Sequence, residues 1–152
     1  MVINIHVEGV PRPGGSKSLF INRKTGKVIV APGSKHSKAW MTLVAEEAKR
    51  SWTRPLLDGF IELSFLFLLP RPKHHYKKGT IKDVAPRWHS CKPDLTKLIR
   101  STEDALTGIV WVDDSRVVKQ VACKRYCDEG ESPGVLISIE KVQEGIEKEI
   151  EK

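Results

Sequence analysis

The chain has 152 residues, of which 39% are hydrophobic and 30% are charged, and its formal net charge is +7. Such a length suits one compact domain, and such a composition excludes an intrinsically disordered chain. The positive charge favours a polyanionic partner such as nucleic acid, while the lack of an apolar run of ~20 residues excludes a spanning helix, so we expect a soluble, cytoplasmic protein without a membrane partner.

The first third of the chain predicts a strand, a hairpin and a helix. Residues 2–8 alternate between apolar and polar side chains, as a half-buried strand does, and lead into a loop rich in glycine, proline and basic residues. Residues 18–22 and 27–30 flank a turn, which predicts a β-hairpin. Apolar residues then recur at helical spacing, which predicts a helix over residues 37–51.

The middle of the chain predicts a buried strand, a long loop and a second helix. Residues 60–69 alternate and then become continuously apolar, which predicts a central strand buried on both faces. The basic loop that follows continues to about residue 89 without periodicity, and loops of that length are usually functional or mobile. The second helix begins at Asp94 or Leu95 and ends at Thr107, before Gly108.

Two further strands are predicted over residues 116–126 and 134–139. The resulting order predicts a single α+β domain that has one mixed β-sheet and two main helices packed mainly on one face. We expect the domain to cover residues 1–140 and residues 141–152 to form a charged C-terminal tail that can be helical. The odd number of cysteines indicates reduced thiols instead of a disulfide framework.

Carboxylates are the candidates for chemistry, because the chain has no glycine-rich phosphate loop and no Ser-His-Asp signature. Asp94 lies at the start of the second helix, and Asp113 and Asp114 lie where a short apolar segment meets a strand. If these segments pack together, Asp94 and Asp114 can converge on one hard cation such as Mg²⁺. The alternatives are structural: Asp94 caps the helix, and Asp113-Asp114 forms an ordinary turn.

Three blocks between Lys92 and Val118 occur in a fixed order. They read Lys-Pro-Asp-Leu-Thr-Lys-Leu-Ile-Arg from Lys92, Asp-Ala-Leu-Thr-Gly from Asp104, and Trp-Val-Asp-Asp-Ser-Arg-Val-Val from Trp111. This pattern resembles the signature of the RusA family of Holliday-junction resolvases, which runs roughly K-P-D-[LI]-D-N-L-x-K, D-A-L-x-G and D-D-[SA]-Q-V-V. The similarity is strong over residues 92–125 and weaker over most of the chain.

The resemblance implies a homodimeric endodeoxyribonuclease, often of phage origin, that resolves four-way DNA junctions by metal-dependent hydrolysis with Mg²⁺ or Mn²⁺. Asp94 and Asp114 match the first and last essential aspartates of the family, which implies that both are metal ligands. Asp113 then supports the loop or the metal shell. Arg100 matches a family lysine near the scissile phosphate, where a fixed cation can stabilise developing charge.

Thr96 departs from the family pattern, which has its second essential aspartate at this position. A hydroxyl is a poorer Mg²⁺ ligand and adds no negative charge. Glu103 can compensate only by reaching back, because it lies ~10 Å further along the helix at about 1.5 Å per residue. Two alternatives therefore stay open: a non-catalytic protein that binds branched DNA, and a nuclease that acts on flaps or forks.

Basic residues in loops are the candidates for contact with DNA phosphates, because their placement suits backbone tracking. Tyr76 and Trp88 are candidates for stacking on exposed bases, although an aromatic residue in a loop often packs against its own protein. The predicted phosphate contacts are Arg12, Lys17, Arg71, Lys73, Lys77, Lys78, Arg87 and Lys92.

Overall fold

The computed structural model describes residues 1–14, 18–31 and 35–144, and it has the predicted α+β fold as a single domain. Four strands form one mixed sheet in the order β1-β8-β4-β7. Strand β4 runs antiparallel to β8 and parallel to β7, which is an edge strand of the sheet. The four strands are β1 (Val2–Glu8), β4 (Ile61–Leu69), β7 (Val117–Tyr126) and β8 (Gly134–Lys141).

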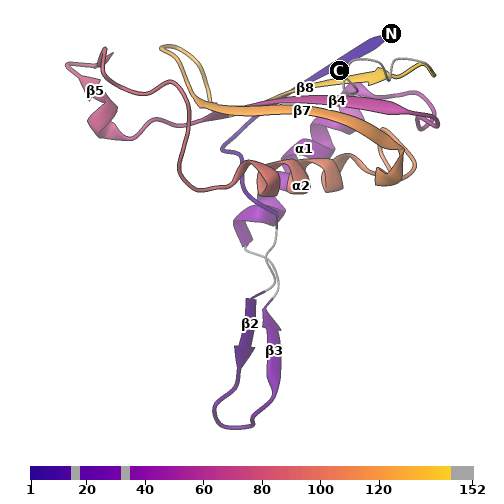
Figure 1. Ribbon diagram of the computed structural model, residues 1–152, viewed down its shortest axis with the longest axis horizontal. Coiled ribbons are helices and arrows are strands. Elements are labelled where there is room, and N and C mark those ends of the chain that lie inside the picture. The colour runs from indigo at the N-terminus through magenta and orange to yellow at the C-terminus, as the bar shows by residue number, and fades with distance from the viewer. Residues whose placement is uncertain (15–17, 32–34, 145–152) are drawn as a thin grey trace, which may run out of the picture.

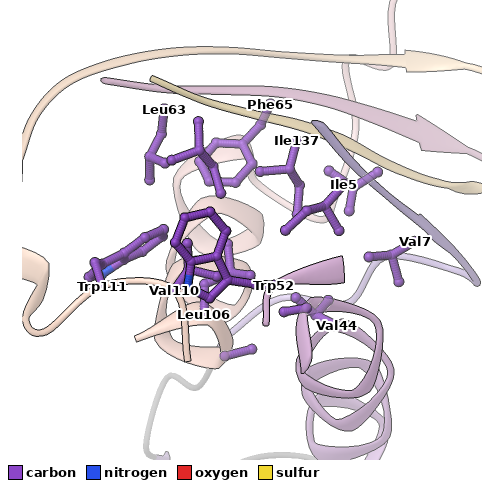
Figure 2. Packing of buried hydrophobic residues seen from close by; sticks show 14 of the residues in the cluster. Ile5, Val7, Val44, Trp52, Leu63, Phe65, Leu106, Val110, Trp111 and Ile137 are labelled. Atoms are coloured by element: carbon purple, nitrogen blue, oxygen red, sulfur yellow. The ribbon is translucent and has the colours of Figure 1, made fainter. Parts of the chain in front are cut away.

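Helices α1 (Lys35–Ser51) and α2 (Leu95–Leu106) lie on the same face of this sheet, as predicted (Figure 1). Alternate residues of β4, among them Leu63 and Phe65, point toward the helices and are almost completely buried. Trp52 and Trp111 fill the space between the sheet and the helices, as Figure 2 shows. This packing fixes α2 and the segment that follows it against the underside of β4 and β7.

The other face of the sheet differs from the prediction. Strand β4 was expected to be buried on both faces, but Ser64 and Leu66 are only half-buried. Their neighbours Val121 and Leu136 are 55% and 43% exposed. This face is therefore open around Ser64 and Leu66, whereas Leu68, near the end of β4 on the same face, is buried, so the expectation holds only for the last residues of the strand.

Strands β2 (Ser18–Ile21) and β3 (Val28–Ala31) form the predicted hairpin, which stands away from the rest of the domain (Figure 1). The long loop after β4 contains short elements that its sequence did not indicate: η1 (Lys73–His75), β5 (Tyr76–Lys77) and β6 (Thr80–Ile81). The three cysteines form no disulfide. No helix among the described residues is long and apolar enough to cross a membrane.

Candidate functional site

Asp94 occupies the position before the first residue of α2, but its carboxylate does not cap the helix. Its backbone carbonyl accepts hydrogen bonds from the amides of Lys97 and Leu98, at 3.1 Å each. The side chain makes no capping hydrogen bond and is 59% exposed. Its only ion pair among the described residues is a 3.8 Å contact with Lys97 Nζ. The capping alternative therefore does not account for the Asp94 carboxylate.

The loop that carries Asp94 is attached to the sheet by Lys124, a residue of β7. Lys124 Nζ donates hydrogen bonds to the carbonyl oxygens of Cys91, at 2.6 Å, and Pro93, at 2.8 Å. These bonds satisfy two carbonyls just before the helix and keep the Lys92–Asp94 segment beside the end of β7. The position of Asp94 thus depends on a contact between residues far apart in the sequence.

A second loop, which follows β1, is attached to α2 itself. Ser101 Oγ donates to the Arg12 carbonyl at 2.7 Å, and the Gly14 amide donates to the Lys97 carbonyl at 2.8 Å. A Cβ atom at Gly14 would lie 2.9 Å from the Ser101 amide nitrogen, so the close approach requires glycine. The loop after β1 is therefore held against α2 at Lys97 and Ser101.

Between these loops lies a cleft with a volume of about 450 Å³. Arg12, Lys92 and Lys97 bring three positive charges to its lining, and Asp94 brings one carboxylate. His89 also lines the cleft, although only 7% of it is exposed. A carboxylate surrounded by cations suits a phosphate that approaches with a metal ion.

Asp114 lies beyond the other end of α2, at the start of η2 (Asp114–Arg116). Its Oδ1 accepts hydrogen bonds from Thr107 Oγ1 and, at 3.2 Å, from Trp111 Nε1. Thr107 is the residue that follows α2, and the Trp111 side chain is fully buried. Two anchored donors therefore fix the Asp114 carboxylate near the C-terminal end of the helix.

Asp113 has a different role from its neighbour. Its Oδ1 accepts a hydrogen bond from the Ser115 backbone amide at 2.8 Å and caps η2. This bond stabilises the charged form and holds the pKa of Asp113 below its usual value. The turn alternative thus describes Asp113, whose carboxylate positions the segment that contains Asp114.

Glu103 and Asp104 are the acidic neighbours of Asp114. Glu103 Oε2 accepts a hydrogen bond from Gln120 Nε2 of β7. Burial, together with the negative charge of Asp114, raises the pKa of both Glu103 and Asp104. Sequence reasoning gave no role to Asp104, although it begins the Asp-Ala-Leu-Thr-Gly block, which was the signal available for it.

Arg100 is exposed on α2, and its positive charge opposes the rise in the pKa of Asp104. It therefore lies on the side of the helix that faces the acidic neighbours of Asp114. Thr96 is exposed one turn earlier, near Asp94. Glu103 bonds Gln120 and interacts with Asp114, so the geometry gives no support to the idea that Glu103 replaces the missing carboxylate at Thr96.

Asp94 and Asp114 do not meet within one chain. Asp94 precedes α2, whereas Asp114 bonds Thr107, and thirteen helical steps of about 1.5 Å separate these two ends by about 20 Å. Mg²⁺ binds each oxygen at about 2.1 Å, so both carboxylates would have to lie within about 4 Å of each other. Among the described residues, no three His, Cys, Asp or Glu side chains are grouped to hold a metal ion. The expected convergence is thus absent from a single chain.

Arg71 differs from the other predicted phosphate contacts because its guanidinium is engaged inside the protein. Its Nε donates to the Cys127 carbonyl at 2.7 Å, and its Nη1 donates to the Pro86 carbonyl at 2.8 Å. The guanidinium also lies over the Tyr126 ring, 5.3 Å from its centre. Arg71 therefore ties the basic loop to the end of β7.

The remaining predicted phosphate contacts are exposed, apart from Lys17, which lies outside the described residues. Of the two aromatic candidates, Trp88 is 59% exposed and Tyr76 is 38% exposed. Trp88 therefore offers an open ring surface to a partner. The exposed cations are Arg12, Lys73, Lys77, Lys78, Arg87 and Lys92.

A known protein family and a bacterial protein are similar to this chain. The profile of a family described as "Endodeoxyribonuclease RusA" matches residues 11–140, which contain both ends of α2 and every carboxylate discussed above. A protein of Bacillus subtilis (strain 168), described as "Uncharacterized protein YqaN", is 27% identical over 112 residues. That match covers 72% of this chain and 75% of the Bacillus protein.

Proposed function

Because the chain belongs to the RusA family of endodeoxyribonucleases, we propose that it is a homodimeric, Mg²⁺-dependent nuclease that resolves four-way DNA junctions. The family implies branched DNA as the substrate and dependence on a divalent metal. The observation that carries the proposal is the family match over residues 11–140. This stretch includes the cationic cleft at Asp94 and the acidic group at Asp114, which consists of Glu103, Asp104 and Asp114. Mn²⁺ is expected to replace Mg²⁺, because it also prefers carboxylate ligands.

The side chains at the two ends of α2 fit such a metal. Carboxylate oxygens are hard ligands of the kind that Mg²⁺ prefers. Asp94 makes no capping bond, and the charges of Glu103, Asp104 and Asp114 disfavour one another, which a cation would relieve. Each end of the helix supplies only part of a ligand set.

Two copies of the chain would complete the set. Helix α2 runs antiparallel to β7, because Pro93 is bonded to Lys124 and Glu103 to Gln120. Among the described residues, the outer edge of β7 is paired only near Arg125, by the segment around Trp88. If two β7–α2 sides meet about a twofold axis, the antiparallel α2 helices bring Asp94 of one protomer to Asp114 of its partner.

A dimer that formed through the open face of the sheet would not bring Asp94 of one protomer to Asp114 of its partner. Packed sheets lie about 10 Å apart, and the helices would then be on the two outer sides of the dimer. The two α2 helices would be separated by both sheets, so Asp94 and Asp114 would stay apart. The β7–α2 side is therefore the surface that we propose for the dimer.

In the proposed reaction, water attacks phosphorus, a new P–O bond forms, and the P–O bond to one neighbouring sugar breaks. Bound Mg²⁺ would supply a Lewis acid and lower the pKa of a coordinated water. Arg12 and Lys92 bind phosphates beside Asp94, and Arg100 stabilises the charge that develops on the phosphate oxygens. Asp113 positions Asp114 through the η2 turn. Two equivalent sites match the two nicks that a four-way junction requires.

Thr96 favours one competing function, a binding protein without activity. Thr96 is exposed near Asp94, and its hydroxyl adds no charge to hold a cation. Such a protein would keep the basic surface and bind junctions in the absence of metal. The acidic group at Asp114 would then have no use, which is why we favour the enzyme.

The test is a cleavage assay with labelled four-way junction, fork and linear duplex, each in Mg²⁺, Mn²⁺ and EDTA. We expect symmetric nicks in the junction with either metal and none in EDTA. The Asp94→Asn variant is expected to lose at least ~100-fold in rate, because it removes a metal ligand. Junction affinity in EDTA should change little.

Glu46→Gln on α1 is the matched control, because it removes an exposed carboxylate outside the proposed site. It should nick at the wild-type rate. Tight junction binding without cleavage in either metal would instead establish the binding protein. Faster cutting of the fork than of the junction would show that the fork is the preferred substrate, while the metal-dependent hydrolysis would stand.

A further inference from the structure

The cleft beside Asp94 has an apolar wall that binding of phosphate and metal does not use. Besides its charged residues, the cleft is lined by Val10, Pro11, Pro13, Leu69, Pro70 and Pro93. Proline rings and aliphatic side chains present flat, dehydrated surfaces, on which a nucleobase can lie without losing hydrogen bonds. A surface that binds only phosphate groups would need positive charges but no apolar residues.

His89 adds a polar group to this wall. Only 7% of the residue is exposed, and its Nδ1 has no hydrogen-bond partner among the described residues. The other ring nitrogen, Nε2, lies 3.5 Å from Cys91 Sγ. Burial lowers the pKa of His89, so the ring is neutral near pH 7 and carries one donor and one acceptor. The neutral ring therefore adds no charge to the wall on which a base can lie.

The cleft is also built to hold its shape. One wall is attached to α2 through Ser101 and Gly14, and the other to β7 through Lys124. Its volume of about 450 Å³ lies within the range of roughly 300–1,000 Å³ found for pockets that bury small ligands. The cleft therefore offers more room than a single phosphate group occupies.

We propose that this cleft holds one unstacked nucleotide of the branched DNA. The base lies on the proline and leucine wall, and Arg12 and Lys92 bind its phosphate. The proposal rests on the function proposed above and deepens it, because it places a determinant of substrate choice next to Asp94. Extruding a base from intact duplex costs free energy, and it costs less where pairing is already disturbed. The cleft would thus favour a junction over duplex.

The test uses four-way junctions that carry 2-aminopurine at one of the nucleotides next to the crossover, bound in EDTA so that no strand is cut. Unstacking of 2-aminopurine raises its fluorescence. With the wild type we expect a rise of several-fold at one position, and little change when the probe lies in a distant arm. Fluorescence anisotropy of an end label measures binding independently.

Val10→Trp is the variant that fills the cleft, since Val10 is 37% exposed and tolerates a larger side chain. It should abolish the 2-aminopurine rise while junction affinity falls by less than about tenfold, because most phosphate contacts lie elsewhere. Val2→Trp, at an exposed position on β1, is the matched control and should behave as the wild type.

Two results would overturn the inference: no rise at any position although the junction is bound, or an unchanged rise with Val10→Trp. A wild type that nicks junctions without raising the fluorescence of any probe would remove the nucleotide site and leave the proposed function intact. A wild type that does not bind the junction at all would instead refute the proposed function, and with it this inference.

Discussion

The acidic residues that the structure describes include some that hold the fold and others that we propose for chemistry. Glu131 belongs to the first group. Its two carboxylate oxygens accept hydrogen bonds from Arg125, at 2.7 and 3.0 Å, and this pairing lowers the pKa of Glu131 to about 2. Asp94, which makes no capping bond and is 59% exposed, belongs to the second.

Replacing Glu131 by Gln should destabilise the protein by about 1–3 kcal/mol at pH 7, because the buried Arg125 loses its two-bond carboxylate partner and keeps only the 3.5 Å ion pair with Asp128. The folded pKa is depressed, so the pair stabilises above the unfolded value of 4.5 and loses this effect as pH falls toward about 2. Urea unfolding of wild type and variant at pH 7 and pH 3 measures the difference. Equal losses at both pH values would contradict the assignment, and Glu140→Gln is the exposed control.

Glu103 should show the opposite dependence. Its folded pKa is raised, so the fold favours the protonated form, and stability is lost as pH rises through the folded pKa. Glu103→Gln keeps an oxygen acceptor for Gln120 and removes the charge. We expect the variant to be more stable than the wild type by on the order of 0.5 kcal/mol at pH 7, and equally stable below pH 4.5, the pKa of an unperturbed glutamate. If the variant and the wild type were equally stable at pH 7 as well as below pH 4.5, the pKa of Glu103 would not be raised by the fold.

At the level of elements, α2 organises the site, and much of it could be predicted from the sequence. The apolar stripe of α2 and Gly108 at its end fix the helix to within one residue of the observed Leu95–Leu106. The hairpin, α1 and the four strands of the sheet follow from periodicity in the same way. The chemical roles of single carboxylates depended on the family resemblance.

The direction of the segment after α2 could not be predicted. Asp114 lies seven residue steps after Thr107, a length that can extend about 24 Å and could in principle return to Asp94. The burial of Trp111 and the bond from the Gly108 amide to the Trp111 carbonyl keep the segment at the end of the helix instead. The sequence shows that Trp111 is apolar, but not which side of the core receives it.

Lys124 attaches the Asp94 loop to β7, so its removal should lower the rate of DNA cleavage. Lys124→Met removes the two hydrogen bonds to the Cys91 and Pro93 carbonyls. We expect nicking to fall by at least about tenfold, since a shift of about 1 Å in a catalytic group is costly. Lys119→Met, on the same strand, removes an ion pair with Glu62 at 3.3 Å and should keep full activity. Unfolding midpoints check that both variants are folded, and equal nicking rates would contradict the role of Lys124.

In the whole domain, the sheet lies above the two helices, and the β2–β3 hairpin projects below them (Figure 1). The two parts of the proposed metal site lie along one side of the domain, at opposite ends of α2. A helix of this length cannot bend back on itself to join them. In the dimer that we propose, each active site therefore takes Asp94 from one protomer and Asp114 from its partner.

A heterodimer of two inactive variants tests whether Asp94 and Asp114 of one active site come from different protomers. Asp94→Asn and Asp114→Asn chains, carrying different tags, are co-expressed, and the heterodimer is purified through both tags and assayed on a four-way junction in Mg²⁺. Each variant alone should be inactive. The heterodimer should nick at about half the wild-type rate, because one of its two sites then combines a native Asp94 with a native Asp114. A purified heterodimer as inactive as its parents would show that each site is formed within a single chain.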